Sequence, residues 1–174
     1  MARPLIKKDQ KGVLYVRPPS IEAKIDGALG QDWEVLSKRA KITDPNALDF
    51  PPRECLVHLI RDAIRRNDQR LATVLMRPLL LRCAANLLKT VPEGGMRNAA
   101  AVREDTLSSF QTLFTEEAAE DALDYFECKF GSAFKSLRLR TSPAFTIHDA
   151  PKEHGRPPSS SSREETTETE NTRS

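Results

Sequence analysis

Glycine is scarce in this sequence of 174 residues, with seven in all, and aromatic side chains make up only 6%. So few glycines leave little material for the tight turns of an all-β fold or for loops that cradle phosphate groups. The most apolar stretch, residues 71–88, contains Arg77, Arg82 and Pro78. A bilayer span would therefore bury two guanidinium groups. We expect neither a β-sandwich nor a membrane protein.

Cysteine is also rare, and its three residues are Cys55, Cys83 and Cys128. They are far apart along the chain and form no C-x-x-C pair, which is typical of reduced thiols in a cytosolic protein. The first eight residues carry positive charge but no apolar stretch behind it, so they do not resemble a secretory signal. The sequence therefore predicts a cytoplasmic location.

The motifs of the common catalytic sites are missing as well. The sequence holds no P-loop, no G-x-G-x-x-G and no H-E-x-x-H. Cys55 and His58 share a C-x-x-H spacing, but a structural zinc site needs four ligands and no second pair lies nearby. The acidic run 116–127 is typical of a solvated helix face. We predict no enzyme, no cofactor, no metal and no small-molecule substrate.

Long amphipathic helices are what the sequence does contain. Between residues 53 and 142 only Pro78 and Pro92 interrupt the chain, and apolar residues recur there every three or four positions. Pro78 is expected to kink its segment or to begin a new helix. The fold class is therefore all-α, a small orthogonal bundle of four to six helices. Its expected core consists of Leu56, Ile60, Leu75, Leu80, Leu107, Phe110, Phe126, Phe130 and Phe134.

Composition divides the chain into four parts. Residues 1–19 form a basic extended arm, whose apolar patch 13–16 fits either a short strand or an extended segment. Residues 20–50 hold short N-terminal helices and a loop, and residues 51–142 hold the main helical domain. Residues 143–174 are rich in Ser, Thr and Glu and have no apolar residue after Ala150, so we predict a disordered tail.

Charge is segregated along the helical part, although the whole chain carries only +2. Residues 53–82 hold seven arginines and three acids, a net +4, and residues 103–127 hold one arginine and eight acids, a net −7. Three interpretations stay open: basic and acidic helix faces that pair with each other, arginines that face phosphate, or a surface for a protein partner.

Residues 71–140 resemble the second conserved region of bacterial RNA polymerase sigma factors. The segment LLLRCAANLL (79–88) stands where an apolar helix precedes the clamp-binding helix. Arg103-Glu104-Asp105, followed by Phe110 and Phe114, is similar to that clamp-binding helix. DYFECKFGSAFKSLRLR (124–140) stands where the DNA-facing helix would be, although the Trp of that helix is absent here and no promoter-reading second domain follows.

This resemblance implies a non-catalytic transcription module with core RNA polymerase as partner and, as a second expectation, promoter DNA. The alternative is a helical protein-interaction or regulatory domain without DNA contact, with a partner that the sequence does not identify. The candidate partner-binding residues are Arg103, Glu104, Asp105, Phe110 and Phe114. The candidate nucleic-acid-binding residues are Arg61, Arg65, Arg66, Arg70, Lys135, Arg138 and Arg140.

Overall fold

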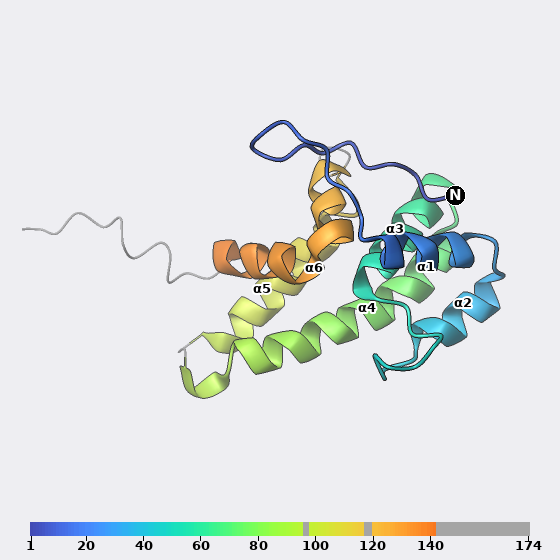
Figure 1. Cartoon of the computed structure of the whole chain (residues 1–174). Coiled ribbons are helices and arrows are strands. Elements are labelled where there is room, and N and C mark those ends of the chain that lie inside the picture. The colour runs from blue at the N-terminus through green and yellow to red at the C-terminus, as the bar shows by residue number, and fades with distance from the viewer. Residues whose placement is uncertain (96–97, 117–119, 142–174) are drawn as a thin grey trace, which may run out of the picture.

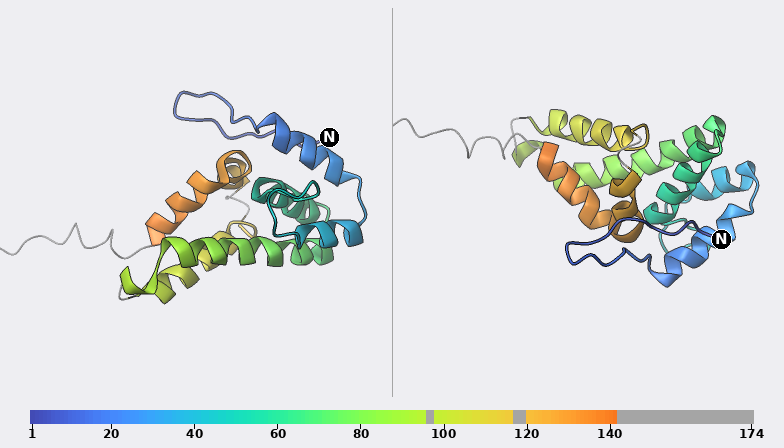
Figure 2. Two further views of the ribbon diagram at one scale, coloured as in Figure 1. Left: turned by 60° about the horizontal axis from the view of Figure 1, so that its bottom comes forward. Right: turned by 90° about the horizontal axis from the view of Figure 1, so that it is seen from above.

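The computed structural model describes residues 1–95, 98–116 and 120–141, and within them it confirms the all-α fold class (Figure 1). The elements are α1 (Pro19–Leu29), α2 (Trp33–Ala40), α3 (Arg53–Arg65), α4 (Gln69–Thr90), the 3-10 turn η1 (Glu93–Gly95), α5 (Ala99–Thr112) and α6 (Glu120–Thr141). The predicted tail 143–174 lies outside the described residues. In Figure 2, α4 runs along the length of the molecule and the other helices are arranged over it.

The connection between α3 and α4 shows how local sequence sets a helix boundary. Asn67 adopts a left-handed backbone conformation, with φ of 58°, which ends α3. The next residue, Asp68, accepts a hydrogen bond from the backbone N–H of Leu71 at 2.9 Å and so caps the first turn of α4. Two adjacent polar residues thus reverse the chain and place α4 against α3.

Pro78 does not begin a new helix, so that alternative of the prediction is wrong. α4 continues from Gln69 to Thr90 with Pro78 inside it. A proline within a helix costs about 3 kcal/mol, because it removes one backbone hydrogen bond and crowds the preceding turn. The buried side chains Leu75, Leu79 and Cys83 surround Pro78 along the helix. Their burial in the core offsets this local cost.

The N-terminal arm forms a short hairpin rather than a strand of a sheet. Lys8 and Leu14 form an isolated antiparallel bridge, and the turn between them contains Gly12 at φ of 81°, a conformation that favours glycine. The side chain of Asp9 accepts hydrogen bonds from the backbone N–H groups of Lys11 and Val13. This resolves the two alternatives for residues 13–16 in favour of an extended segment with a single bridge.

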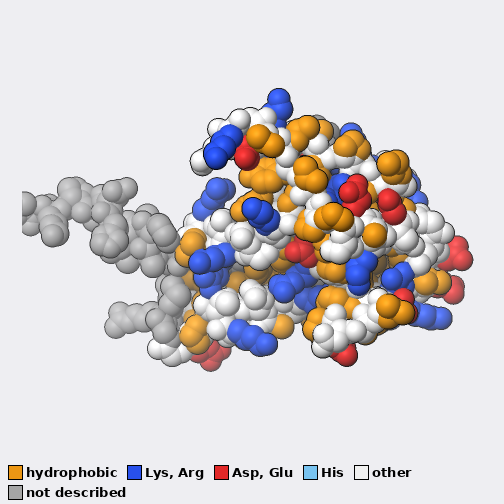
Figure 3. Space-filling model, viewed as in Figure 1, with side chains coloured by type: hydrophobic (Ala, Val, Ile, Leu, Met, Phe, Trp, Pro, Cys, Tyr) orange, Lys and Arg blue, Asp and Glu red, His pale blue; other side chains and the backbone are white. Residues whose placement is uncertain are grey.

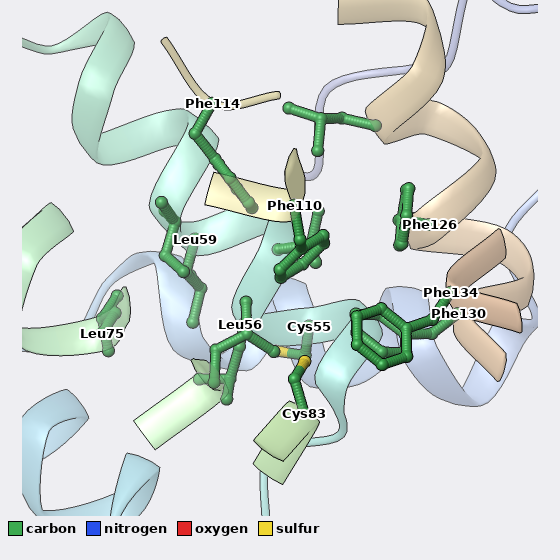
Figure 4. Close-up of a cluster of buried hydrophobic side chains, with 14 of the residues drawn as sticks. Cys55, Leu56, Leu59, Leu75, Cys83, Phe110, Phe114, Phe126, Phe130 and Phe134 are labelled. Carbon is green, nitrogen blue, oxygen red and sulfur yellow. The ribbon is translucent and has the colours of Figure 1, made fainter. Parts of the chain in front are cut away.

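An aromatic cluster joins α5 to α6 at the centre of the core (Figure 4). The ring of Phe110 has its centroid between 5.0 and 5.7 Å from four other rings, and α6 bends at Lys129, whose backbone is not helical. Of the nine predicted core residues, seven are buried, while Leu80 and Leu107 are only partly buried. The four rings around Phe110 belong to Phe114, Phe126, Phe130 and Phe134.

All three cysteines are buried as free thiols, which leads to a first prediction. Burial raises the pKa of Cys55 and of Cys83 to about 12 and that of Cys128 to about 11. At about pH 8, the folded protein should react with a thiol reagent such as DTNB at least ~100-fold more slowly than the unfolded protein, because the thiolate is the reactive form. The control is the same reaction in denaturing urea, where three thiols react. Rapid labelling of the folded chain would contradict this account.

Candidate functional site

A cluster of buried charged side chains lies where the N-terminal arm, α3 and α6 meet. Glu127 is completely buried and accepts a hydrogen bond from Arg17 Nε to its Oε2 at 2.7 Å. Its other oxygen, Oε1, pairs with Nη1 of Arg61, which also contacts Oδ1 of Asp124 at 2.8 Å. Nδ1 of His58 lies 2.9 Å from Oε2 of Glu127. Two arginines thus balance two carboxylates, with the imidazole beside them.

The same cluster fastens the N-terminal arm to the helices. Oδ2 of Asp124 accepts hydrogen bonds from the backbone N–H groups of Ile6 and Lys7, at 2.7 and 2.9 Å. Nη2 of Arg17 donates to the backbone carbonyl of Arg3 at 2.7 Å. These contacts tie both sides of the arm hairpin to α6, and Figure 1 shows the arm passing over the first half of that helix.

The position of Glu127 determines what this cluster can do chemically. Burial would raise the pKa of Glu127, but the hydrogen bond from His58 and the positive charges of His58, Arg61 and Arg17 outweigh burial and hold that pKa below its ordinary value. The carboxylate is therefore ionised, and a buried, fully paired carboxylate has no access to a substrate. None of the three described cavities is lined by Arg17, Arg61 or Glu127. The ion pairs of the cluster instead connect the N-terminal arm, α3 and α6, and so contribute to the stability of the fold.

A pH dependence of stability follows from the lowered pKa of Glu127. In the unfolded chain this carboxyl titrates near 4.5. The stability that it contributes is fully present above that pH and is lost as the pH falls through the lower pKa of the folded state. Urea unfolding should therefore show a falling free energy of unfolding below about pH 4.5. The difference between wild type and Glu127→Gln should shrink over the same interval, and a difference that stays constant would contradict the assignment.

Arg61, one of the candidate nucleic-acid-binding residues, is not on the surface. Its side chain is 6% exposed and is paired with Asp124 and Glu127, so the prediction that it faces nucleic acid is corrected. Arg66 is exposed and pairs with Asp62 one turn earlier, at 2.9 Å. Arg70 lies over the ring of Trp33, 3.9 Å from its centroid, and Arg65 is half-buried.

The remaining candidate nucleic-acid-binding residues lie at the opposite end of α4. Arg138 donates a hydrogen bond to the backbone carbonyl of Thr90, the last residue of α4, and Lys135 and Arg140 are exposed on the same half of α6. Arg70 belongs to the first turn of α4. A helix of 22 residues is about 33 Å long. The structure therefore does not unite the two predicted basic groups into one surface.

Some of the candidate partner-binding residues are buried and others are exposed. Phe110 and Phe114 are buried in the aromatic cluster, so they are corrected from contact residues to core residues. Arg103 pairs with Glu93 at 2.9 Å and is only partly exposed. Glu104 and Asp105 are exposed on α5 and remain available to a partner.

The acidic run 116–127 contains the residues that the sequence analysis missed. It was expected to be a solvated face, but Asp124 and Glu127 are buried and ion-paired. One signal was present in the sequence. Glu127 lies four residues after Leu123 and three before Phe130, which places a carboxylate inside the apolar stripe of its helix. A charge at such a position needs a buried partner.

An open groove runs between α4 and α5, and no residue of the ionic cluster lines it. Its volume is about 710 Å³, and among the apolar residues of α4 that line it, Met76, Leu80, Leu81 and Ala84 follow helical spacing. Leu81 is 63% exposed. Its other lining residues are Ile64, Gln69, Ala72, Thr73, Arg77, Leu107, Ser108, Gln111, Thr112, Phe114 and Thr115.

Metal-ligating groups and apolar helices are two further features of the described residues. No group of three His, Cys, Asp or Glu side chains there is placed to hold a metal ion. Cys55 lies in the hydrophobic core, whereas His58 belongs to the ionic cluster through its contact with Glu127. By length and composition alone, α4 is apolar enough to cross a membrane. Within this fold it packs against α2, α3 and α5.

Comparisons with protein-family models, with curated proteins and with solved structures find no match to this chain.

Proposed function

We propose that this chain is a non-catalytic, cytoplasmic protein-interaction module whose α4–α5 groove binds an amphipathic helix of a partner protein. The observation that supports this is the groove itself. Its apolar wall is continuous along α4, yet the fold leaves Leu81 largely exposed to water. Exposed apolar surface of this kind is costly unless it has a partner. Helix-in-groove recognition uses this arrangement of apolar residues.

The length of the groove indicates the length of the bound helix. The lining residues of α4 run from Gln69 to Ala84, about 22 Å at 1.5 Å per residue. A partner helix of about 15 residues would fill this length, with apolar side chains at i, i+3 or i+4 and i+7.

The charges beside the groove indicate the polar residues of that helix. Arg77 is the one charged residue among those that line the groove. Glu104 is exposed and lies one turn before Leu107 and Ser108 on the same face of α5. We therefore expect an acidic residue near the middle of the partner helix, opposite Arg77, and a basic residue near one end, opposite Glu104.

Two neighbouring alanines of α4 provide the test. Ala84 lines the groove, whereas Ala85 does not. A photo-crosslinking amino acid at position 84 should capture a partner segment that has helical apolar periodicity and the two charges described above. Ala84→Glu should lower the affinity for the purified partner at least ~10-fold. A charge buried in an apolar contact should cost more than about 1.4 kcal/mol of binding free energy.

The matched control is Ala85→Glu, which adds the same charge one position along the same helix. It should change partner affinity less than about twofold, because exposed substitutions outside a contact are nearly neutral. Equal weakening by both variants, or a captured segment without apolar periodicity, would contradict the proposal.

Core RNA polymerase is the one specific partner that the sigma-factor resemblance suggests, and it remains a candidate for this module. Among the five candidate partner-binding residues, Glu104 and Asp105 are the two that the fold leaves exposed. DNA contact would then depend on Lys135, Arg138 and Arg140 at the end of α6. Core polymerase should co-purify with wild type and not with a variant in which both Glu104 and Asp105 are replaced by lysine.

Duplex binding would test the DNA half of that candidate. Affinity for DNA should fall steeply with rising salt, and Arg138→Glu should weaken it. If the folded protein does not bind duplex DNA at low salt, DNA is removed from the proposal. The proposal that the α4–α5 groove binds a partner helix would be unaffected.

A further inference from the structure

A second cavity, separate from the α4–α5 groove except for the shared Leu81, lies between α4 and the loop that joins α2 to α3. Its volume is about 610 Å³, within the usual range of small-ligand sites. Four of its lining residues are cations, Lys41, Arg53, Arg82 and Lys89, and none is acidic. Its other lining residues are Ala40, Thr43, Pro45, Phe50, Pro78, Leu81, Ala85 and Asn86.

These four cations lack counter-charges within the described part of the chain. No carboxylate there lies within 4.0 Å of any of them, whereas Arg17, Arg39, Arg61, Arg66 and Arg103 each have an acidic partner. Figure 3 shows Lys and Arg side chains gathered across the middle of one face of the molecule. Four like charges around one cavity repel one another, and an anion placed among them would remove that repulsion.

One of the cations is held rigidly. Arg82 donates hydrogen bonds to the backbone carbonyls of Ala40, Ile42 and Pro51, at 2.9, 2.7 and 2.6 Å. Its guanidinium carbon also lies 4.4 Å from the centroid of the Phe50 ring. These contacts fix the α2–α3 loop against α4, so one wall of the cavity is already formed before any ligand binds.

The surroundings of Arg82 lower its pKa. Burial lowers the pKa of Arg82, and the nearby positive charge of Arg53 lowers that pKa further. Arg53 is itself held in place, with its guanidinium carbon 5.3 Å from the centroid of the Phe130 ring. Both guanidinium groups thus line the cavity while each is held on an aromatic ring, and a multiply charged oxyanion would stabilise two such like charges.

The remaining surface of the cavity restricts the ligand further. Pro45, Pro78 and Ala85 form an apolar wall beside the cations, and Asn86 and Thr43 supply neutral hydrogen-bonding groups. A bare inorganic ion would leave most of the 610 Å³ unfilled. The composition fits an organic phosphate with a body of nucleotide size, whose charged groups meet the cations and whose apolar part meets the prolines.

We infer that the cavity between α4 and the α2–α3 loop, lined by Lys41, Arg53, Arg82 and Lys89, is a binding site for a small, multiply charged organic phosphate. The site is independent of the proposed helix-binding groove, so either can fail without the other. It adds a ligand, not a substrate, to a chain from which no catalysis is expected.

Titration calorimetry of the full chain at low salt, with ATP and with inorganic tripolyphosphate as probes, tests this site. ATP should bind with measurable heat and at least about tenfold more tightly than tripolyphosphate, because only ATP supplies an apolar body. The double variant Lys41→Ala/Lys89→Ala should lower the affinity for ATP at least ~10-fold. Both lysines are exposed, so folding should be unchanged, as circular dichroism will verify.

The matched control is Lys8→Ala/Lys135→Ala, which removes the same charge from two exposed lysines outside the cavity. Its ATP affinity should change less than about twofold. Absence of ATP binding at millimolar concentration would overturn the inference, and so would equal weakening by the control variant.

Two further probes identify other sources of phosphate. Vesicles of phosphatidylcholine with phosphatidylserine should not compete with ATP. The inference would be overturned if a duplex DNA displaced ATP and both double variants lowered the affinity for that DNA equally. The cations would then belong to a nucleic-acid-binding surface.

Discussion

Glu127→Gln is expected to lower the free energy of unfolding by about 3–5 kcal/mol, the usual cost of removing one partner from a buried ion pair. The glutamine keeps the shape of the side chain but removes the charge that Arg17, Arg61 and His58 face. Because those groups remain buried, the variant leaves positive charge without compensation. Urea unfolding followed by circular dichroism measures the effect.

Glu116→Gln is the matched control, since it makes the same substitution at an exposed position of the same acidic run. It should change the free energy of unfolding by less than about 0.5 kcal/mol. A loss below about 1 kcal/mol in Glu127→Gln would show that the ionic cluster contributes little to stability, and the role assigned to it here would have to be abandoned.

Phe110→Ala is expected to destabilise the protein by about 3–5 kcal/mol, the range for deleting a large aromatic side chain from a core. Phe110 is completely buried, and its ring contacts that of Phe114, just after α5, and three rings of α6 (Figure 4). The deletion removes both apolar burial and these ring contacts, and it leaves a cavity that the surrounding helices fill only in part.

The control for Phe110→Ala is Leu48→Ala, because Leu48 is 92% exposed. Its effect should stay within about 0.5 kcal/mol. The same pair of variants also separates the core role of Phe110 from a contact role. A Phe110→Ala protein that keeps its stability but loses a partner would restore the contact role that the sequence suggested for this residue.

The sequence by itself determined the helices, because helical periodicity is a local property. The spacing of Phe126, Phe130 and Phe134 predicts one buried face whatever that face packs against, and it was found in the core. Asn67 and Asp68 likewise end one helix and cap the next through contacts within a few residues. The all-α fold class and most of the core follow from such short-range patterns.

Only the tertiary structure decided which charged side chains are buried. Arg61 and Glu127 are 66 residues apart, and nothing in the local sequence of either identifies the other. Arg17, from the N-terminal arm, completes the same cluster across 110 residues. Charged residues enter a core only when distant partners meet them there, because an unpaired buried charge is too costly. Pairing of that kind depends on how the helices pack.

The two candidate sites are also products of packing. The α4–α5 groove is lined mainly by residues of two different helices, and it includes Leu80 and Leu107, which the sequence assigned to the core. The cationic cavity joins Lys41 to Lys89, which come from the α2–α3 loop and from the end of α4. Residue spacing along a chain predicts the face of a helix, but it does not predict the distance between two helices.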